Sequence, residues 1–135
     1  VYGKIKASET FTVEGKEYQT ADFIGETIYG RKIAVHGDTR LNSKEDYLNQ
    51  LFNADLIVHE ATFLKDEKEK AHDYFHSEIN QVLNMFSELN YKQLLFVHIS
   101  SRYTDEDIRE VSAALNDKAA IAFDYFELPI PRNVQ

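Results

Sequence analysis

The sequence predicts an α/β protein built on a mostly parallel sheet. From residue 32 onward, short apolar runs alternate with segments of helical spacing, the order that parallel strands joined by crossover helices require. Three of the apolar runs end in a Val-His pair and continue into polar residues, at His36, His59 and His98. Because parallel strands end at the same edge of a sheet, these polar residues should meet there, where open α/β sheets bind their ligands.

The first 30 residues are expected to form a short antiparallel edge. Residues 1–5 and 10–13 have strand composition, and Glu14-Gly15-Lys16 has the composition of a hairpin turn. Gly25 and Gly30 then mark a loop before the first strand of the parallel sheet.

The remaining elements follow in alternation. Ser43 can cap a helix, and the clearest helix opens at His76 and carries Val82 and Phe86 at helical spacing. Residues 64–71 are charged and are expected to lie in solvent, with a helix as one option. We predict strands at residues 32–36, 55–59, 94–98 and 119–123 and helices at 43–52, 76–89 and 105–115, before Pro129 and Pro131 close the ordered region.

Composition narrows the classes of function. At 135 residues and 43% hydrophobic, the chain can bury one core, so we expect residues 1–135 to form a single domain. No apolar run approaches the roughly 20 residues of a membrane span, and no secretory leader is visible, so we expect a cytoplasmic chain without membrane contact. Without cysteine, any metal must be held by His, Asp or Glu. The net charge of −8 argues against this segment gripping nucleic acid by itself.

Asp38 and His98 are candidate metal ligands. Asp38 follows Gly37 just past a strand end, where backbone freedom lets a carboxylate turn into a cleft, and its two oxygens can bridge two cations. His98 ends the most apolar strand and places its ring at the sheet edge. The residues alone leave two plainer roles open, Asp38 as a cap of the following loop and His98 as a hydrogen-bonded structural histidine. Polar residues from three strand ends at one edge of the sheet favour a functional site.

Glu60 and His76 form a second candidate pair, suited to proton transfer. Glu60 follows a strand, and His76 opens a helix at the positive end of its dipole. A carboxylate near an imidazole fixes its tautomer and raises its basicity, as a general acid requires. The alternative is that His76 is a helix-start residue beside an exposed glutamate.

Four motifs occur in a fixed order along the chain. They are Gly37-Asp38-Thr39-Arg40, His59-Glu60-Ala61-Thr62-Phe63, His76-Ser77 and His98-Ile99-Ser100-Ser101-Arg102-Tyr103. Together they resemble the carboxyl-terminal half of ribonuclease Z, the family of transfer-RNA 3′-processing endonucleases with the metallo-β-lactamase fold. The first motif recurs across that superfamily, whereas the second and the fourth are specific.

The resemblance implies a fold, an activity and a set of residue roles. The fold is half of an αββα sandwich, and the activity is zinc-dependent removal of the 3′ trailer from precursor transfer RNA by a homodimer with two zinc ions in the active site. Asp38 matches the zinc-bridging ligand, and His98 matches the late histidine ligand. His76 and Glu60 match the pair that stabilises the scissile phosphate and handles protons on the leaving group. Arg102 is implied to contact the substrate.

Two departures from the family pattern stand out. The first metal motif, His-any-His-any-Asp-His, and the basic arm that grips transfer RNA are both absent. We therefore expect the other ligands in a missing amino-terminal half, and the start at Val1 with Met85 as the only methionine favours the same view. One face of the sheet would then lack its partner layer. Near the motifs, unusual residues for the family are His36, Leu41, Phe75 and Glu78.

Two alternatives remain. One is a phosphodiesterase or arylsulfatase relative of the same fold, against which the specific second and fourth motifs speak. The other is a non-catalytic carboxyl-half module for interaction or dimerisation, which the residues upstream of Val1 would distinguish from a nuclease.

Overall fold

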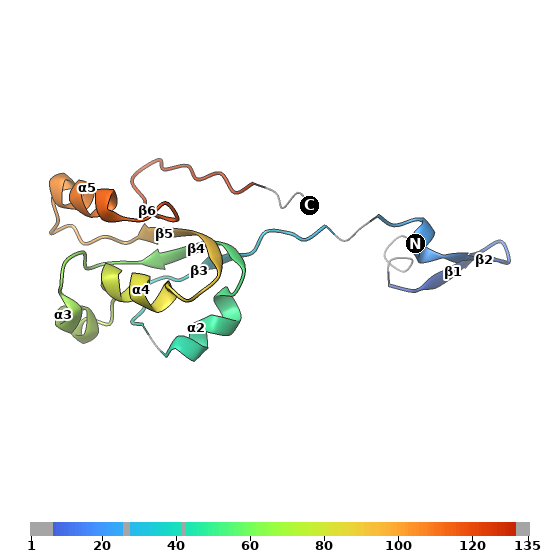
Figure 1. Ribbon diagram of the computed structural model, residues 1–135, viewed down its shortest axis with the longest axis horizontal. Coiled ribbons are helices and arrows are strands. Elements are labelled where there is room, and N and C mark those ends of the chain that lie inside the picture. Colours follow the sequence, from blue (N-terminus) through green and yellow to red (C-terminus); the bar gives the residue numbers. More distant parts are fainter. Residues whose placement is uncertain (1–6, 26–27, 42, 132–135) are drawn as a thin grey trace. The chain divides into compact units, whose positions relative to one another are not determined.

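The computed structural model describes residues 7–25, 28–41 and 43–131 of the chain (Figure 1). They fall into two compact units, one ending at Gly30 and one beginning at Arg31. The strand predicted at residues 1–5 lies outside the described residues, and the assignment of residues 1–135 to a single domain stays a prediction. None of the helices in the described ranges is long and apolar enough to cross a bilayer.

The first unit is a β-hairpin, as predicted. Strands β1 (Thr10–Val13) and β2 (Lys16–Gln19) pair antiparallel, and the 3-10 helix η1 (Thr20–Asp22) follows. The turn residues Glu14 and Gly15 both have positive φ, 49° and 78°. Two such residues give a turn whose twist matches that of the flanking strands, which explains why a glycine stands there.

The second unit contains a four-stranded parallel sheet, and the predicted fold class is confirmed in its α/β character. The strands are β3 (Ile33–Val35), β4 (Ala54–Glu60), β5 (Tyr91–Val97) and β6 (Ala119–Ile121), side by side in that order. The helices are α2 (Lys44–Leu51) after β3, α3 (Lys68–Asp73) and α4 (Ile79–Phe86) after β4, and α5 (Asp105–Ala114) after β5.

The start of α4 differs from the prediction. The helix begins at Ile79 instead of His76, because the Glu78 side chain caps it by accepting a hydrogen bond from the Gln81 N–H at 3.0 Å. Glu78 also forms a parallel bridge with Phe63, and the Ile79 N–H donates to the Phe63 carbonyl at 2.9 Å. His76 therefore lies in an extended connection beside the end of β4, outside the helix.

The charged stretch at residues 64–71 is not fully in solvent, which corrects the prediction. Leu64 and Ala71 are buried, while the charged residues between them are exposed or half-buried. The Leu64 N–H donates to the Tyr103 hydroxyl at 3.0 Å, and Ala71 lies on the inner side of the short helix α3. Apolar residues at both ends thus anchor a segment whose composition is otherwise polar.

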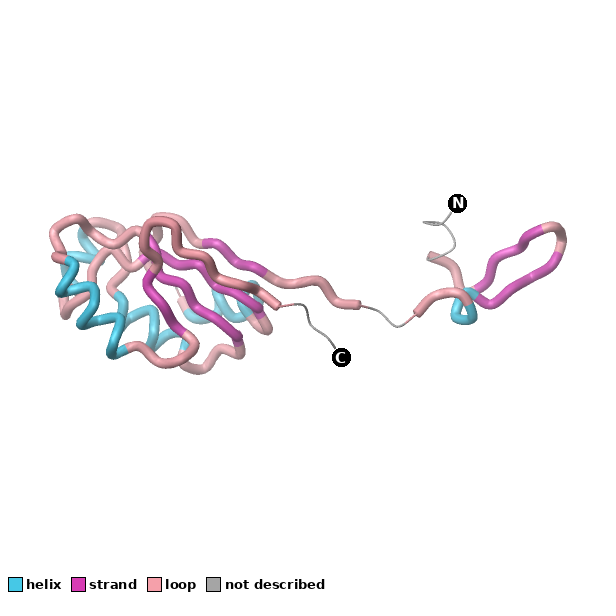
Figure 2. The backbone as a smooth tube through the Cα atoms, turned by 90° about the horizontal axis from the view of Figure 1, so that it is seen from above, coloured by secondary structure: helices cyan, strands magenta, loops and turns pink. Residues whose placement is uncertain are grey.

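Helices cover one face of the sheet more completely than the other face is covered. Side chains alternate between the faces of a strand, and one set packs with the helices into the core. Its members include Ile57, Leu94 and Phe96 of the sheet with Leu51 of α2 and Val82 and Phe86 of α4. On the other face Ile33 is 50% and Val35 is 71% exposed, and Val58 and Leu95 are half-buried. Figure 2 shows the strands of this sheet from above. This face therefore carries exposed apolar side chains at β3, whereas Leu56 of β4, beside Ile33, is buried.

Candidate metal and catalytic site

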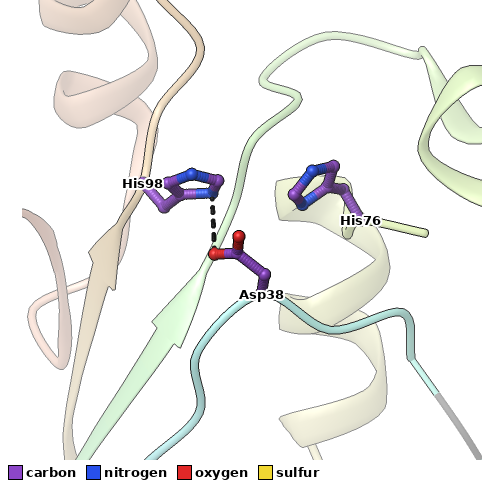
Figure 3. Close-up of side chains that lie close together, drawn as sticks. All are labelled: Asp38, His76 and His98. Carbon is purple, nitrogen blue, oxygen red and sulfur yellow. Dashed lines mark ion pairs between the residues drawn. The ribbon is translucent and has the colours of Figure 1, made fainter. Parts of the chain in front are cut away.

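Three side chains meet at the carboxyl edge of the sheet, where the sequence predicts a site (Figure 3). Asp38 follows β3, His98 follows β5, and His76 precedes α4. Each offers a ligand atom, and these atoms lie within 4.8 Å of one another. Asp38 Oδ1 is 3.3 Å from Nδ1 of His98. The two candidate ligands and the candidate proton carrier are thus brought together from three separate segments.

His98 has an unusual backbone. Its φ is 58°, in the left-handed region that residues other than glycine rarely enter, and it comes directly after the last residue of β5. Such conformations cost energy and persist mainly where surrounding contacts over-determine them, often at functional sites. One such contact is the Thr62 hydroxyl, 3.0 Å from Nδ1 of His98.

Glu60 is a fully buried carboxylate that ties the site together. Its Oε1 accepts the backbone N–H of Ser77 at 2.8 Å and of Thr39 at 3.3 Å. Its Oε2 accepts the N–H and the hydroxyl of Thr62 at 2.8 and 3.0 Å. Oε1 also lies 3.2 Å from Nδ1 of His76. A buried carboxylate is costly unless it is hydrogen-bonded, and here every contact is with a group that can donate.

The chain around His76 is held on both sides. The Ser77 hydroxyl donates to the Thr39 carbonyl at 2.7 Å, and the Phe63 N–H donates to the Ser77 carbonyl at 3.2 Å. These bonds join the connection before α4 to the segments after β3 and β4. The position of the His76 ring is therefore fixed by backbone contacts as well as by Glu60.

The other two strand-end histidines form a pair of their own. His36 and His59 stack with 5.2 Å between ring centroids, and His59 is completely buried. Burial lowers the pKa of both imidazoles, and the nearby His36 lowers that of His59 further. Nδ1 of His59 lies 2.7 Å from the Glu60 carbonyl oxygen. These two rings are not members of the metal-capable group found among the described residues.

A cavity of about 1050 Å³ opens beside the site, between α5 and β6. Its lining includes His98, the apolar side chains of Ile99 and Ile108, and the charged side chains of Arg109 and Asp124. His98 thus borders both the Asp38 carboxylate and a space large enough for a small molecule.

Residues 5–99 match the β-lactamase superfamily domain, a span that contains Asp38, Glu60, His76 and His98. The chain belongs to the metallo-β-lactamase superfamily. Its parallel sheet with helices and its small antiparallel hairpin form part of the metallo-β-lactamase fold, as predicted.

The chain is a homologue of ribonuclease Z within this superfamily. Ribonuclease Z of Staphylococcus aureus strain Newman is 40% identical over 114 residues, which cover 84% of this chain and 37% of that protein. Ribonuclease Z of strain JH9 is 41% identical over 110 residues, which cover 82% of this chain and 35% of that protein. The chain therefore spans little more than a third of the length of these relatives.

Solved structures give the same relationship. The crystal structure of human tRNase Z, short form (ELAC1), superposes with a TM-score of 0.60 at 27% identity, covering 76% of this chain and 34% of that one. The crystal structure of a long form RNase Z from yeast superposes with a TM-score of 0.53 at 30% identity. The match covers 68% of this chain and 12% of that one. A diphosphatase from the PhnP family superposes with a TM-score of 0.59 at 18% identity, covering 78% of this chain and 38% of that one. At this identity the match shows a shared fold alone.

In this homologue of ribonuclease Z, Arg102 makes contacts within the chain. Its guanidinium lies over the Phe63 ring at 4.9 Å, Nη1 lies 3.3 Å from a Glu67 carboxylate oxygen, and Nε donates to the Ser100 hydroxyl at 3.2 Å. The Tyr103 hydroxyl donates to the same Glu67 carboxylate. A substrate contact by Arg102 stays a prediction; the guanidinium has five N–H donors, and these bonds use one on Nε and one on Nη1.

Thr62 is a functional candidate that sequence reasoning did not single out. Its hydroxyl lies 3.2 Å from Nδ1 of His76, in addition to its contacts with Glu60 and His98. Its place in the second motif, two residues after Glu60 in the loop that follows β4, was the available signal. Spacing alone does not assign it a role.

The donor set suits zinc. Zinc is bound in proteins by imidazole nitrogen and carboxylate oxygen, and a catalytic zinc commonly has three protein ligands with a fourth position open. Asp38 and His98 supply one donor of each kind, and the carboxylate has a second oxygen that can bridge. A site for two ions needs more donors than the described residues gather at this edge.

Proposed function

We propose that this chain is the carboxyl-terminal part of a zinc-dependent endoribonuclease that removes the 3′ trailer from precursor transfer RNA. The observation that carries the proposal is the buried Glu60 carboxylate, 3.2 Å from Nδ1 of His76, which itself lies in one group with Asp38 and His98. Its support comes from 40% identity to a ribonuclease Z over 84% of the chain.

Each site residue has a role in this reaction. Asp38 would bridge two zinc ions and His98 would bind one of them, and the bound ions would supply Lewis-acid activation of the phosphodiester and of the attacking water. His76 would donate a proton to the leaving oxygen, and Glu60 would orient its ring and stabilise its charged form. Arg102 would contact the substrate through its guanidinium group.

The remaining ligands would come from an amino-terminal half. The sheet face that carries the exposed Ile33 and Val35 is the surface on which that half would pack. Basic surface for the RNA would also come from outside this acidic segment. From the family resemblance we place the intact enzyme in the cytoplasm, as a homodimer without membrane contact.

A chimeric enzyme tests the proposal. The amino-terminal part of Staphylococcus aureus ribonuclease Z would be fused to this chain, and cleavage of a precursor transfer RNA with a 3′ trailer would be measured. We expect release of the trailer, and no release from the Asp38→Ala chimera. A folded chimera with normal zinc content that leaves the trailer uncut would favour the alternative, a non-catalytic interaction or dimerisation module.

A further inference from the structure

The Thr62 hydroxyl touches three titratable side chains of the site. Thr62 is 9% exposed, and its Oγ1 lies 3.0 Å from Glu60 Oε2, 3.2 Å from Nδ1 of His76 and 3.0 Å from Nδ1 of His98. A hydroxyl carries one proton and two lone pairs, so it can donate once and accept twice.

Counting protons assigns the direction of every bond. The Glu60 carboxylate only accepts, so the single Thr62 proton must point to Oε2. The two imidazole contacts must then be bonds that Thr62 accepts. Both histidines therefore carry a hydrogen on Nδ1, since any other arrangement would set lone pairs against each other.

Independent neighbours require the same assignment. Nδ1 of His76 also faces Glu60 Oε1 at 3.2 Å, and Nδ1 of His98 also faces Asp38 Oδ1 at 3.3 Å. Both of these oxygens are acceptors. The Thr62 backbone N–H donates to Glu60 Oε2 at 2.8 Å, which fixes the threonine with respect to the carboxylate.

We infer that Thr62 is a positioning residue that holds His76 and His98 as Nδ1–H tautomers, leaving the Nε2 lone pair of each ring available for chemistry. An outer partner of this kind sets the ring orientation and tautomer of a metal-binding histidine. The use of the two Nε2 atoms, for zinc by His98 and for proton exchange by His76, rests on the proposed function. The tautomers themselves do not.

The two rings should depend on Thr62 to different extents. His76 keeps the buried Glu60 as a second acceptor if Thr62 is lost. The second acceptor of His98 is Asp38, which is 66% exposed and competes with water. His98 is therefore the sensitive reporter.

Nitrogen NMR of the metal-free chain tests the inference. Long-range ¹H–¹⁵N correlation spectra of the imidazoles distinguish a protonated from an unprotonated ring nitrogen, and would be recorded at a pH where the rings are neutral. In the wild type we expect both His76 and His98 to show Nδ1–H and a bare Nε2. In Thr62→Val we expect His98 to lose this signature and His76 to keep it, whereas in Thr62→Ser both rings should keep it.

The control is Thr39→Val, the same change at a neighbouring threonine whose hydroxyl donates to the Arg40 carbonyl and touches neither histidine. It should leave both tautomers as in the wild type. An Nε2–H tautomer of either ring in the wild type would overturn the inference, whatever the stability of the variants. So would an unchanged His98 in a folded Thr62→Val chain. Because neither zinc nor RNA is present, the result is independent of whether the chimera cleaves RNA.

Discussion

Two pairs of histidines lie near the carboxyl edge of the same sheet, and the comparison shows what makes a site. The rings of His36 and His59 and those of His76 and His98 are each 5.2 Å apart. In the first pair His59 is completely buried and His36 is half-buried, and desolvation lowers the pKa of both rings. The second pair has carboxylate and hydroxyl partners and reaches solvent, with His98 49% exposed. Contact with a side-chain carboxylate, with a hydroxyl and with solvent, more than the strand-end position, marks the second pair as a chemical site.

The largest effect should come from Asp38, the carboxylate beside His98 of the second pair. In the intact enzyme or the chimera, Asp38→Ala should abolish turnover and zinc retention together, because a bridging ligand holds both ions. Zinc content by mass spectrometry and cleavage of precursor transfer RNA would be measured. The exposed Asp73→Ala is the matched control and should retain both. Normal zinc content in Asp38→Ala would remove Asp38 from the ligand set.

The next largest effect should come from His76, because it is the proposed proton donor. His76→Ala should slow the chemical step by about 10²–10⁴-fold with little change in substrate affinity. The loss should shrink for an aryl phosphodiester whose leaving group needs no proton. Single-turnover rates on the two substrates would be compared. Equal losses on both would exclude leaving-group protonation and indicate a role in positioning the phosphate.

Glu60→Gln separates the orienting role of Glu60 from metal binding. The amide nitrogen would face backbone N–H donors that now meet a carboxylate oxygen, so we expect a loss of about 1–3 kcal/mol in the free energy of unfolding. Turnover should fall about 10–100-fold because His76 loses its charged acceptor. Zinc content should stay near normal. A fall in zinc as sharp as in Asp38→Ala would show that Glu60 acts on the metal and not through His76.

The parts of the structure that depend on local pattern were predictable. The alternation of strands and helices follows from apolar spacing, as in Val82 and Phe86 of α4, and it placed Asp38 and His98 at one edge. The start of α4 was missed because the cap at Glu78 depends on a bridge to Phe63, a partner distant in sequence.

The missed contacts of the site share this origin. Thr62 reaches two histidines only because the chain turns after β4 and because His98 takes a positive φ, and neither feature has a local signature. Arg102 meets Glu67 because the charged segment after β4 is anchored at its apolar ends. Side-chain partners set by long-range packing are the part that spacing does not encode.

Zinc titration of this chain alone tests whether the pair of His36 and His59 can bind metal, which would contradict the difference drawn between the two pairs. We expect weak or undetectable binding by calorimetry, because Asp38 and His98 provide too few ligands for a closed or catalytic site. Tight stoichiometric binding that survives Asp38→Ala and disappears in His36→Ala would mean that the buried pair is the metal site in this chain. Tight binding lost in both variants would mean that the two histidine pairs act together.

The smallest effect concerns the dependence of stability on pH, and it tests the buried pair. Burial lowers the pKa of His59 from its ordinary value of 6.5, so near that pH the unfolded chain binds a proton that the folded chain does not. The free energy of unfolding should therefore fall as the pH drops below about 6.5, and continue to fall until the folded-state pKa is passed.

Urea unfolding at about pH 7.5 and about pH 5.5 would measure this fall. His59→Phe keeps a flat ring against Phe86, whose centroid lies 5.5 Å away, but takes up no proton. We expect the variant to lose less stability on acidification than the wild type. His72→Phe, at an exposed position of α3, is the control and should fall as steeply as the wild type. An equal fall in the free energy of unfolding of wild type and His59→Phe would show that His59 does not cause the pH dependence. The electrostatic difference between the two histidine pairs would then depend on His76 and His98 alone.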